Sequence, residues 1–229
     1  MAAYDLEEQE QIAELKAWWK QHGNRLVNTV TVVAVIVVAW QGWGLYQRNQ
    51  ASEASMVYSA LQQAVQVGDT QRIKAASGEL IEKFSRTTYA SLGTLISAKA
   101  MTEGGETQTA KAQLTWATEH AKDELRDLAR LRLAALLLDE KAYDQALGHL
   151  EGAASPSFEA RFQDMRGDIL SAQGKKAEAK TAYQTALDKL GASEKDSKGA
   201  VAGQERQSQS NIIFRELISQ KIDASGGGE

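Results

Sequence analysis

The chain has 229 residues, of which 43% are hydrophobic and 24% charged, as in one medium-sized domain with a short additional segment. Its formal net charge of −4 argues against a dedicated nucleic-acid-binding protein, because neutralising phosphates requires clustered Lys and Arg. The absence of cysteine excludes disulfides, thiolate metal sites, Cys nucleophiles and a lipid-modified N-terminal Cys. The single proline, Pro156, favours long helices over strands.

Residues 1–25 are predicted to form a short amphipathic helix on the cytoplasmic side of a membrane. Ile12, Leu15 and Trp19 recur at helical spacing. Acidic residues come first and Lys16 and Lys20 follow, an order that complements the helix dipole. A glycine at position 23 is well placed to end this helix.

Residues 26–47 are predicted to form a transmembrane helix. The stretch from Leu26 to Tyr46 contains ten Leu, Val or Ile residues and no charge. At about 1.5 Å per residue its 21 positions span roughly 32 Å, close to the thickness of a bilayer's hydrocarbon core. A core helix of a soluble protein is the alternative, but core helices seldom run this far without a charge. No cleavage site follows the run, so an uncleaved anchor is favoured over a signal peptide.

The flanks of this segment predict an aromatic belt and an orientation. Three basic residues lie shortly before the span, whereas only Arg48 lies within twenty residues after it, which predicts a cytoplasmic N-terminus. The rest of the chain then faces the periplasm. Aromatic residues that anchor helices at membrane interfaces cluster at both ends of the run. They are Trp18, Trp19, Trp40, Trp43 and Tyr46.

Residues 48–190 are predicted to form a tetratricopeptide-like solenoid. Three segments share one spacing of small and large apolar residues, in which the later members lie 12, 16 and 19 positions after the first. Small residues at these positions let two antiparallel helices approach, and a larger residue fills the gap beside them. The sets are Ala98, Ala110, Leu114 and Ala117; Ala134, Ala146, Leu150 and Ala153; and Gly167, Ala179, Tyr183 and Ala186. An unrelated Ala-rich bundle is the alternative.

The same domain is predicted to begin with a further helix pair, 55–67 and 70–84, joined through Gly68 and Asp69. After the repeats, residues 191–210 are polar and small and are predicted to be a linker. Residues 211–229 are predicted to form an apolar C-terminal helix followed by a disordered tail. The predicted fold class is therefore all-α, with one N-terminal transmembrane helix and a helical-repeat solenoid.

No pattern in the sequence indicates catalysis. The three histidines, His22, His120 and His149, stand in no known ligand spacing, and no phosphate-binding glycine motif is present. Adjacent carboxylates such as Asp139 and Glu140 diverge around a helix and cannot act as a facing acid–base pair. We expect a protein that is not an enzyme, with no cofactor, no metal and no small-molecule substrate.

A solenoid without catalytic groups usually acts through a binding surface. The positions that line the groove of tetratricopeptide domains correspond here to five leucines: Leu92, Leu95, Leu128, Leu131 and Leu138. Two interpretations are open. Neighbouring helices, or the C-terminal helix around Phe214 and Leu217, cover these leucines, or they form a groove for an apolar segment of a partner.

An acidic start, the pattern Lys16-x-Trp18-Trp19 and Gly23 before one N-terminal span, followed by helical repeats, resembles the bacterial YfgM-like family of ancillary SecYEG translocon subunits. This resemblance implies a single-pass inner-membrane protein with a periplasmic repeat domain. It also implies association with the SecYEG translocon and with a membrane-anchored periplasmic chaperone of the peptidyl-prolyl isomerase type. The function implied is a scaffold that helps emerging polypeptides reach folding factors. The alternative is a membrane-bound regulatory adaptor whose cytoplasmic helix, residues 5–22, contacts a signalling protein.

Overall fold

A computed structural model describes residues 2–196 and 204–226, and every regular element in these ranges is a helix. The predicted all-α fold class is confirmed. The helices are α1 (Ala2–Val67), α2 (Thr70–Phe84), α3 (Thr88–Glu103), α4 (Thr107–His120), α5 (Asp123–Asp139), α6 (Tyr143–His149), α7 (Glu159–Ala172), α8 (Lys176–Asp196) and α9 (Gln204–Gly226).

The chain divides into two compact units, residues 1–52 and 53–229. The first unit contains only the N-terminal part of α1. This helix continues through Gly23, so the prediction that the glycine ends a separate amphipathic helix is wrong. One glycine inside a helix costs only about 1 kcal/mol. Here it also makes room for an indole, because a Cβ at Gly23 would lie 3.0 Å from the Trp19 ring.

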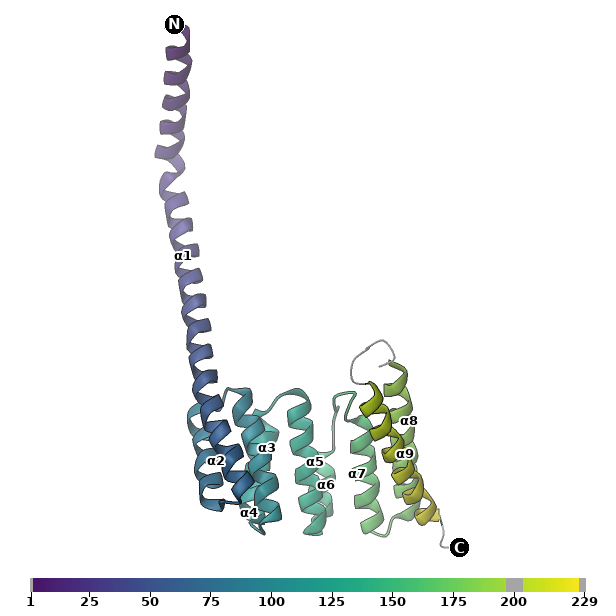
Figure 1. The fold of residues 1–229 in the computed structure, drawn as a ribbon. Helices are drawn as coiled ribbons and strands as arrows, with labels where there is room; N and C mark the ends of the chain where they lie inside the picture. Colours follow the sequence, from purple (N-terminus) through teal and green to yellow (C-terminus); the bar gives the residue numbers. More distant parts are fainter. Residues whose placement is uncertain (1, 197–203, 227–229) are drawn as a thin grey trace. The chain divides into compact units, whose positions relative to one another are not determined.

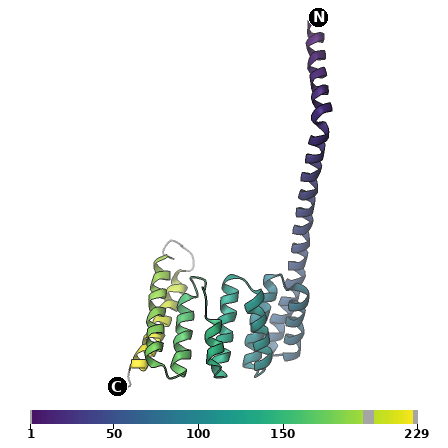
Figure 2. The same cartoon turned by 180° about the vertical axis from the view of Figure 1, so that it is seen from behind.

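The second unit is a row of antiparallel helices. The last turns of α1 pair with α2, and the pairs α3–α4, α5–α6 and α7–α8 follow in order, with α9 last (Figure 1). Seen from behind, the helices keep the same order (Figure 2). Each helix from α2 onward packs against its neighbours in sequence, and α5 also packs against α3 and α7. Each helix pair therefore contacts only the neighbouring helix pairs, which is the arrangement of a solenoid, as predicted.

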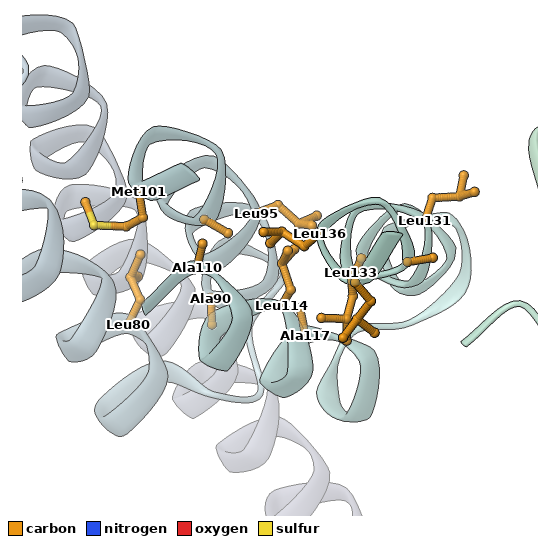
Figure 3. Packing of buried hydrophobic residues seen from close by; sticks show 14 of the residues in the cluster. Leu80, Ala90, Leu95, Met101, Ala110, Leu114, Ala117, Leu131, Leu133 and Leu136 are labelled. Atoms are coloured by element: carbon orange, nitrogen blue, oxygen red, sulfur yellow. The ribbon is translucent and has the colours of Figure 1, made fainter. Parts of the chain in front are cut away.

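Small residues set the spacing within this row. Ala90, Ala110 and Ala117 are fully buried between helices, where larger side chains such as Leu80, Leu114 and Leu133 interdigitate with them (Figure 3). The main core cluster extends from Ala54 on α1 to Ile169 on α7. A second cluster lies at the end of the row and joins α7, α8 and α9.

The C-terminal part differs from the prediction of a linker over 191–210. Helix α8 continues to Asp196 and α9 begins at Gln204, so residues 191–196 and 204–210 are helical. This stretch contains no proline to stop a helix. The predicted linker residues 197–203 and tail residues 227–229 lie outside the described part of the chain. Ser225 and Gly226, predicted to belong to the tail, lie within α9.

Candidate functional site

The predicted transmembrane segment lies within α1, and its apolar side chains are uncovered. Among the described residues, α1 is the one helix long and apolar enough to cross a membrane, and no part of its most apolar stretch is buried by protein. A core helix of a soluble protein would be covered by its neighbours. The exposed run therefore fits a membrane anchor.

The aromatic residues predicted to form a belt flank this run. Trp18 and Trp19 precede it, Trp40, Trp43 and Tyr46 lie near its end, and all five are exposed. Two contacts organise them: the Trp18 ring stacks on His22 at a centroid distance of 5.4 Å, and the Trp43 and Tyr46 rings lie 6.0 Å apart. Their assignment to membrane interfaces remains a prediction.

The residues of the repeat pattern lie between the helices of each pair, with one exception. Eleven of the twelve are buried: Ala98, Ala110, Leu114, Ala117, Ala134, Ala146, Leu150, Gly167, Ala179, Tyr183 and Ala186. Ala153 is exposed, contrary to the prediction. Helix α6 ends at His149, so position 153 falls in the loop before α7 rather than on a third helical turn.

Gly167 and Tyr183 show why the pattern needs a residue without a side chain. A Cβ at Gly167 would lie 2.3 Å from the Tyr183 ring, so only glycine allows α7 and α8 to approach this closely. The Tyr183 hydroxyl donates a hydrogen bond to the Asp168 carboxylate at 2.8 Å. Burial, together with this carboxylate, raises the pKa of Tyr183 and keeps the hydroxyl protonated.

The five leucines of the candidate groove, for which the sequence left cover by neighbouring helices and an open groove as alternatives, differ in burial. Leu95 and Leu131 are only 3% and 8% exposed, and Leu128 and Leu138 are half-buried against the same core. Leu92 is also half-buried. The covering comes from neighbouring helices: α3 and α5 lie side by side, and the Arg132 guanidinium on α5 donates to the Leu95 carbonyl on α3 at 2.8 Å.

A buried ion pair that the sequence analysis missed positions the loop after α6. Asp127 is 1% exposed, and it accepts hydrogen bonds from Arg130 at 3.1 Å and from the Ser155 backbone N–H at 2.7 Å. Burial would raise the pKa of Asp127, but these hydrogen bonds and the Arg130 charge outweigh it and hold the pKa below the usual range of an aspartate. Arg130 also donates to the carbonyls of His149 and Glu151. The i, i+3 spacing of an acid and an arginine is the signal that was available in the sequence.

One interpretation of the sequence placed the C-terminal helix over the candidate groove leucines. In the structure this helix packs on the last repeat instead. Phe214, Ile218 and Ile222 on α9 pack against the α7–α8 pair. Lys221 donates to Asp164 at 2.8 Å and to Asp168 at 2.9 Å, both on α7. Burial opposes the charge on Lys221, but the two carboxylates outweigh burial and raise its pKa. One lysine between two aspartates thus fixes the position of α9.

An open groove lies instead at the other end of the row, between the last turns of α1 and α2. Its volume is about 630 Å³. Its lining includes small side chains such as Ala60, Ala64 and Ala76, and also Arg72 and Glu79 of α2. Among the residues that the structure describes, no group of three or more His, Asp or Glu side chains is placed to hold a metal ion.

Comparison with known proteins assigns the chain to a protein family. A family model described as "Tetratricopeptide repeat-like domain" matches residues 16–204. A protein of Haemophilus influenzae named "Ancillary SecYEG translocon subunit" is 34% identical over 80% of this chain and 90% of its own length. Proteins with the same name from Neisseria gonorrhoeae and Escherichia coli are 28% and 29% identical, over 98% and 79% of this chain and 99% and 87% of their own lengths.

The match covers both the repeats and part of the apolar N-terminal helix, and the H. influenzae relative is aligned over most of its own length. The resemblance noted from the pattern around Trp18 and Trp19 is thereby confirmed. The chain belongs to the YfgM-like family, with a tetratricopeptide repeat-like domain.

Proposed function

We propose that the protein is an interaction scaffold at the SecYEG translocon. The observation that carries this proposal is the combination of an uncovered apolar stretch in α1 with a helical-repeat domain, in a chain whose relatives are named as translocon subunits. The anchor keeps the repeat domain at the membrane, and solenoids of this class bind partners through their extended surfaces.

We further propose that the N-terminus is cytoplasmic and the repeat domain periplasmic, in the inner membrane of a bacterium. Lys16, Lys20 and Arg25 before the span support this orientation. In the periplasm the repeat domain would meet polypeptides as they leave the channel. There it would link the channel to a membrane-anchored chaperone of the peptidyl-prolyl isomerase type.

The proposed contact surface for this chaperone is what remains of the predicted leucine groove. Leu95 and Leu131 are too buried to contact a partner, but Leu92, Leu128 and Leu138 keep partial exposure on α3 and α5. Half-buried leucines on adjacent helices suit an apolar segment of a partner.

Affinity capture from membranes solubilised in a mild detergent tests the translocon contact. We expect the tagged full-length protein to recover the translocon subunits and a periplasmic isomerase-type chaperone. Leu92→Glu should reduce recovery of the chaperone while leaving the translocon subunits unchanged, and Ala112→Glu, on the exposed face of α4, should change neither. Capture without translocon subunits would refute the scaffold. Equal chaperone recovery with Leu92→Glu would refute the contact surface alone.

Protease protection tests the orientation. In spheroplasts, external protease should degrade the repeat domain and leave a protected N-terminal fragment that includes the span. A repeat domain protected until the membrane is broken would contradict the proposed compartment and partners together.

The regulatory alternative assigns the function to residues 5–22. Its support is the exposed apolar face that Leu15, Trp18 and Trp19 form on α1. Deleting residues 5–22 should abolish a regulatory phenotype under this alternative. Translocon capture by the same variant should stay near the wild-type level if the scaffold proposal is correct.

A further inference from the structure

The two ends of the repeat domain expose apolar side chains, whereas its middle does not. Among the described residues from 53 onward, large hydrophobic side chains are exposed on the first and last helices and on none of the helices between them. At the first end they are Met56 and Val67, and at the last end they are Ile212, Ile213 and Leu217. Solenoids that remain single normally end in helices with polar outer faces.

The first end is a groove and the last end is a ridge. The groove between α1 and α2 is lined by several alanines together with Met56 and Val67. On α9, the inner face docks on α7 and α8, which leaves Ile213 and Leu217, one turn apart, on the outside. A helix ridge with residues at i and i+4 fits the groove between two packed helices.

These two surfaces cannot meet within one molecule. Both views place α2 and α9 at opposite ends of the row (Figures 1 and 2). Helix α9 runs in the same direction as the last turns of α1 and opposite to α2 (Figure 1). A second copy that continues the row therefore brings its α9 against the α1–α2 groove, parallel to the last turns of α1 and antiparallel to α2.

The charges beside the two surfaces are complementary in this arrangement. Arg72 and Lys83 are exposed on α2, and each has a local acidic partner: the N-cap residue Asp69 lies 3.2 Å from Arg72, and Glu79 on α2 lies 2.9 Å from Lys83. Helix α9 carries Glu216 and Asp223 on its exposed side. In this arrangement α9 and α2 would run in opposite directions, so Asp223 near the end of α9 would lie toward Arg72 near the start of α2, and Glu216 would lie toward Lys83.

We propose that the protein associates with itself end to end, with α9 of one copy seated in the α1–α2 groove of the next. This contact joins unlike surfaces, so it can repeat along a row of molecules rather than stop at a pair. Confinement of the copies to one membrane raises their effective concentration and favours a contact of modest area. The inference goes beyond the proposed scaffold function and does not depend on the translocon.

Thiol crosslinking of the full-length protein tests the contact, since the chain has no cysteine of its own. Met56→Cys and Ile213→Cys variants with different tags are purified and reconstituted together in phospholipid vesicles with no other protein. A short bismaleimide should join the two variants to each other, and a Met56→Cys, Ile213→Cys double variant should give a ladder of multimers. Gln145→Cys, exposed on α6 in the middle of the row, replaces either partner as the matched control.

Two further variants test the chemistry of the contact. Leu217→Glu should lower the crosslinking yield by about tenfold or more, because a charge replaces a side chain that the contact buries. Arg72→Glu should lower it about two- to fivefold, and Asp223→Arg on the partner copy should restore it. Gln145→Glu should leave the yield unchanged. Circular dichroism checks that each variant is folded.

The outcomes separate the alternatives. Crosslinks between two Met56→Cys copies, or between two Ile213→Cys copies, in place of the mixed product would show contact between like ends and overturn the proposal. A mixed product no stronger than with Gln145→Cys would also overturn it, as would a yield insensitive to both Leu217→Glu and the Arg72 charge reversal. Because no translocon is present, none of these results bears on the proposed function.

Discussion

Replacing Gly167 with alanine tests the close approach of α7 and α8 directly. Alanine is the better helix former by about 1 kcal/mol, so local propensity alone predicts a more stable protein. In the structure, however, the new Cβ would lie 2.3 Å from the Tyr183 ring, which is buried and held by its hydrogen bond to Asp168. Such overpacking costs about 1–3 kcal/mol, and a displaced hydroxyl loses about 1 kcal/mol more. After the gain in helix propensity is subtracted, we expect Gly167→Ala to be about 1–3 kcal/mol less stable than the wild type.

Gly78→Ala on α2 is the matched control, because no atom lies within 4 Å of the Cβ that it would add. This variant should be about 0.5–1 kcal/mol more stable. Urea unfolding of the full-length protein in a non-ionic detergent, followed by circular dichroism, measures both changes. With a slope of about 2 kcal/mol per molar urea, the Gly167→Ala midpoint should fall by roughly 0.5–1.5 M.

Hydrogen exchange should assign the loss to α7 and α8, because solenoids unfold in segments. Adding Tyr183→Leu should remove most of the penalty of Gly167→Ala, giving a coupling between the two positions. The reasoning would be refuted if Gly167→Ala were as stable as Gly78→Ala, or if its penalty persisted without the tyrosine ring.

Three other perturbations follow from the same packing. Ala110→Leu should lower the free energy of unfolding by about 1–3 kcal/mol through overpacking, whereas Ala112→Leu on the exposed face of α4 should change it little. The midpoints of urea unfolding measure both changes. Lys221→Met leaves Asp164 and Asp168 without their cation, so hydrogen exchange in α9 should quicken by an amount equivalent to about 1–2 kcal/mol. Lys180→Met, at an exposed position on α8, should not have this effect. If α9 were protected equally in the wild type and in Lys221→Met, the role assigned to Lys221 would be contradicted. The pKa of Asp127 is lowered in the folded state, so its stabilising contribution is present above the pKa of an unfolded aspartate and is lost as pH falls through the folded-state pKa. Urea midpoints measured on going from about pH 5 to about pH 3 should therefore decline less steeply for Asp127→Asn than for the wild type.

Local patterns predicted most of the helical framework. Helix α1 ends at Val67 and α2 begins at Thr70, as the Gly68-Asp69 pair indicated, and the Asp69 side chain accepts from the Arg72 backbone N–H at the start of α2. The spacing of small residues likewise identified positions such as Ala134 and Ala179 that are fully buried. These features depend on residues close in sequence, and periodicity reports them directly.

Other features depend on which elements come together across longer distances. Helix propensity did not indicate that α6 ends at His149. The loop after α6 is held by Arg130 on α5, and such a contact between separate helices leaves no signal in the local sequence. Likewise, a polar composition suggested a linker where α8 continues. The residues there form helix because nothing in them prevents it, and α9 then docks through Lys221 and Ile218.

The amino-acid sequence by itself determined the apolar span, the all-α class and the positions where helices pack closely, because each of these depends on the composition and spacing of residues that are close in the chain. Only the tertiary structure decided which apolar faces are covered. Leu95 and Leu131 occupy positions typical of a binding groove, yet neighbouring helices bury them, whereas Met56 and Ile213 remain exposed at the two ends of the row. Coverage of a face depends on which helix packs against it, and the pattern along a single helix does not specify that neighbour.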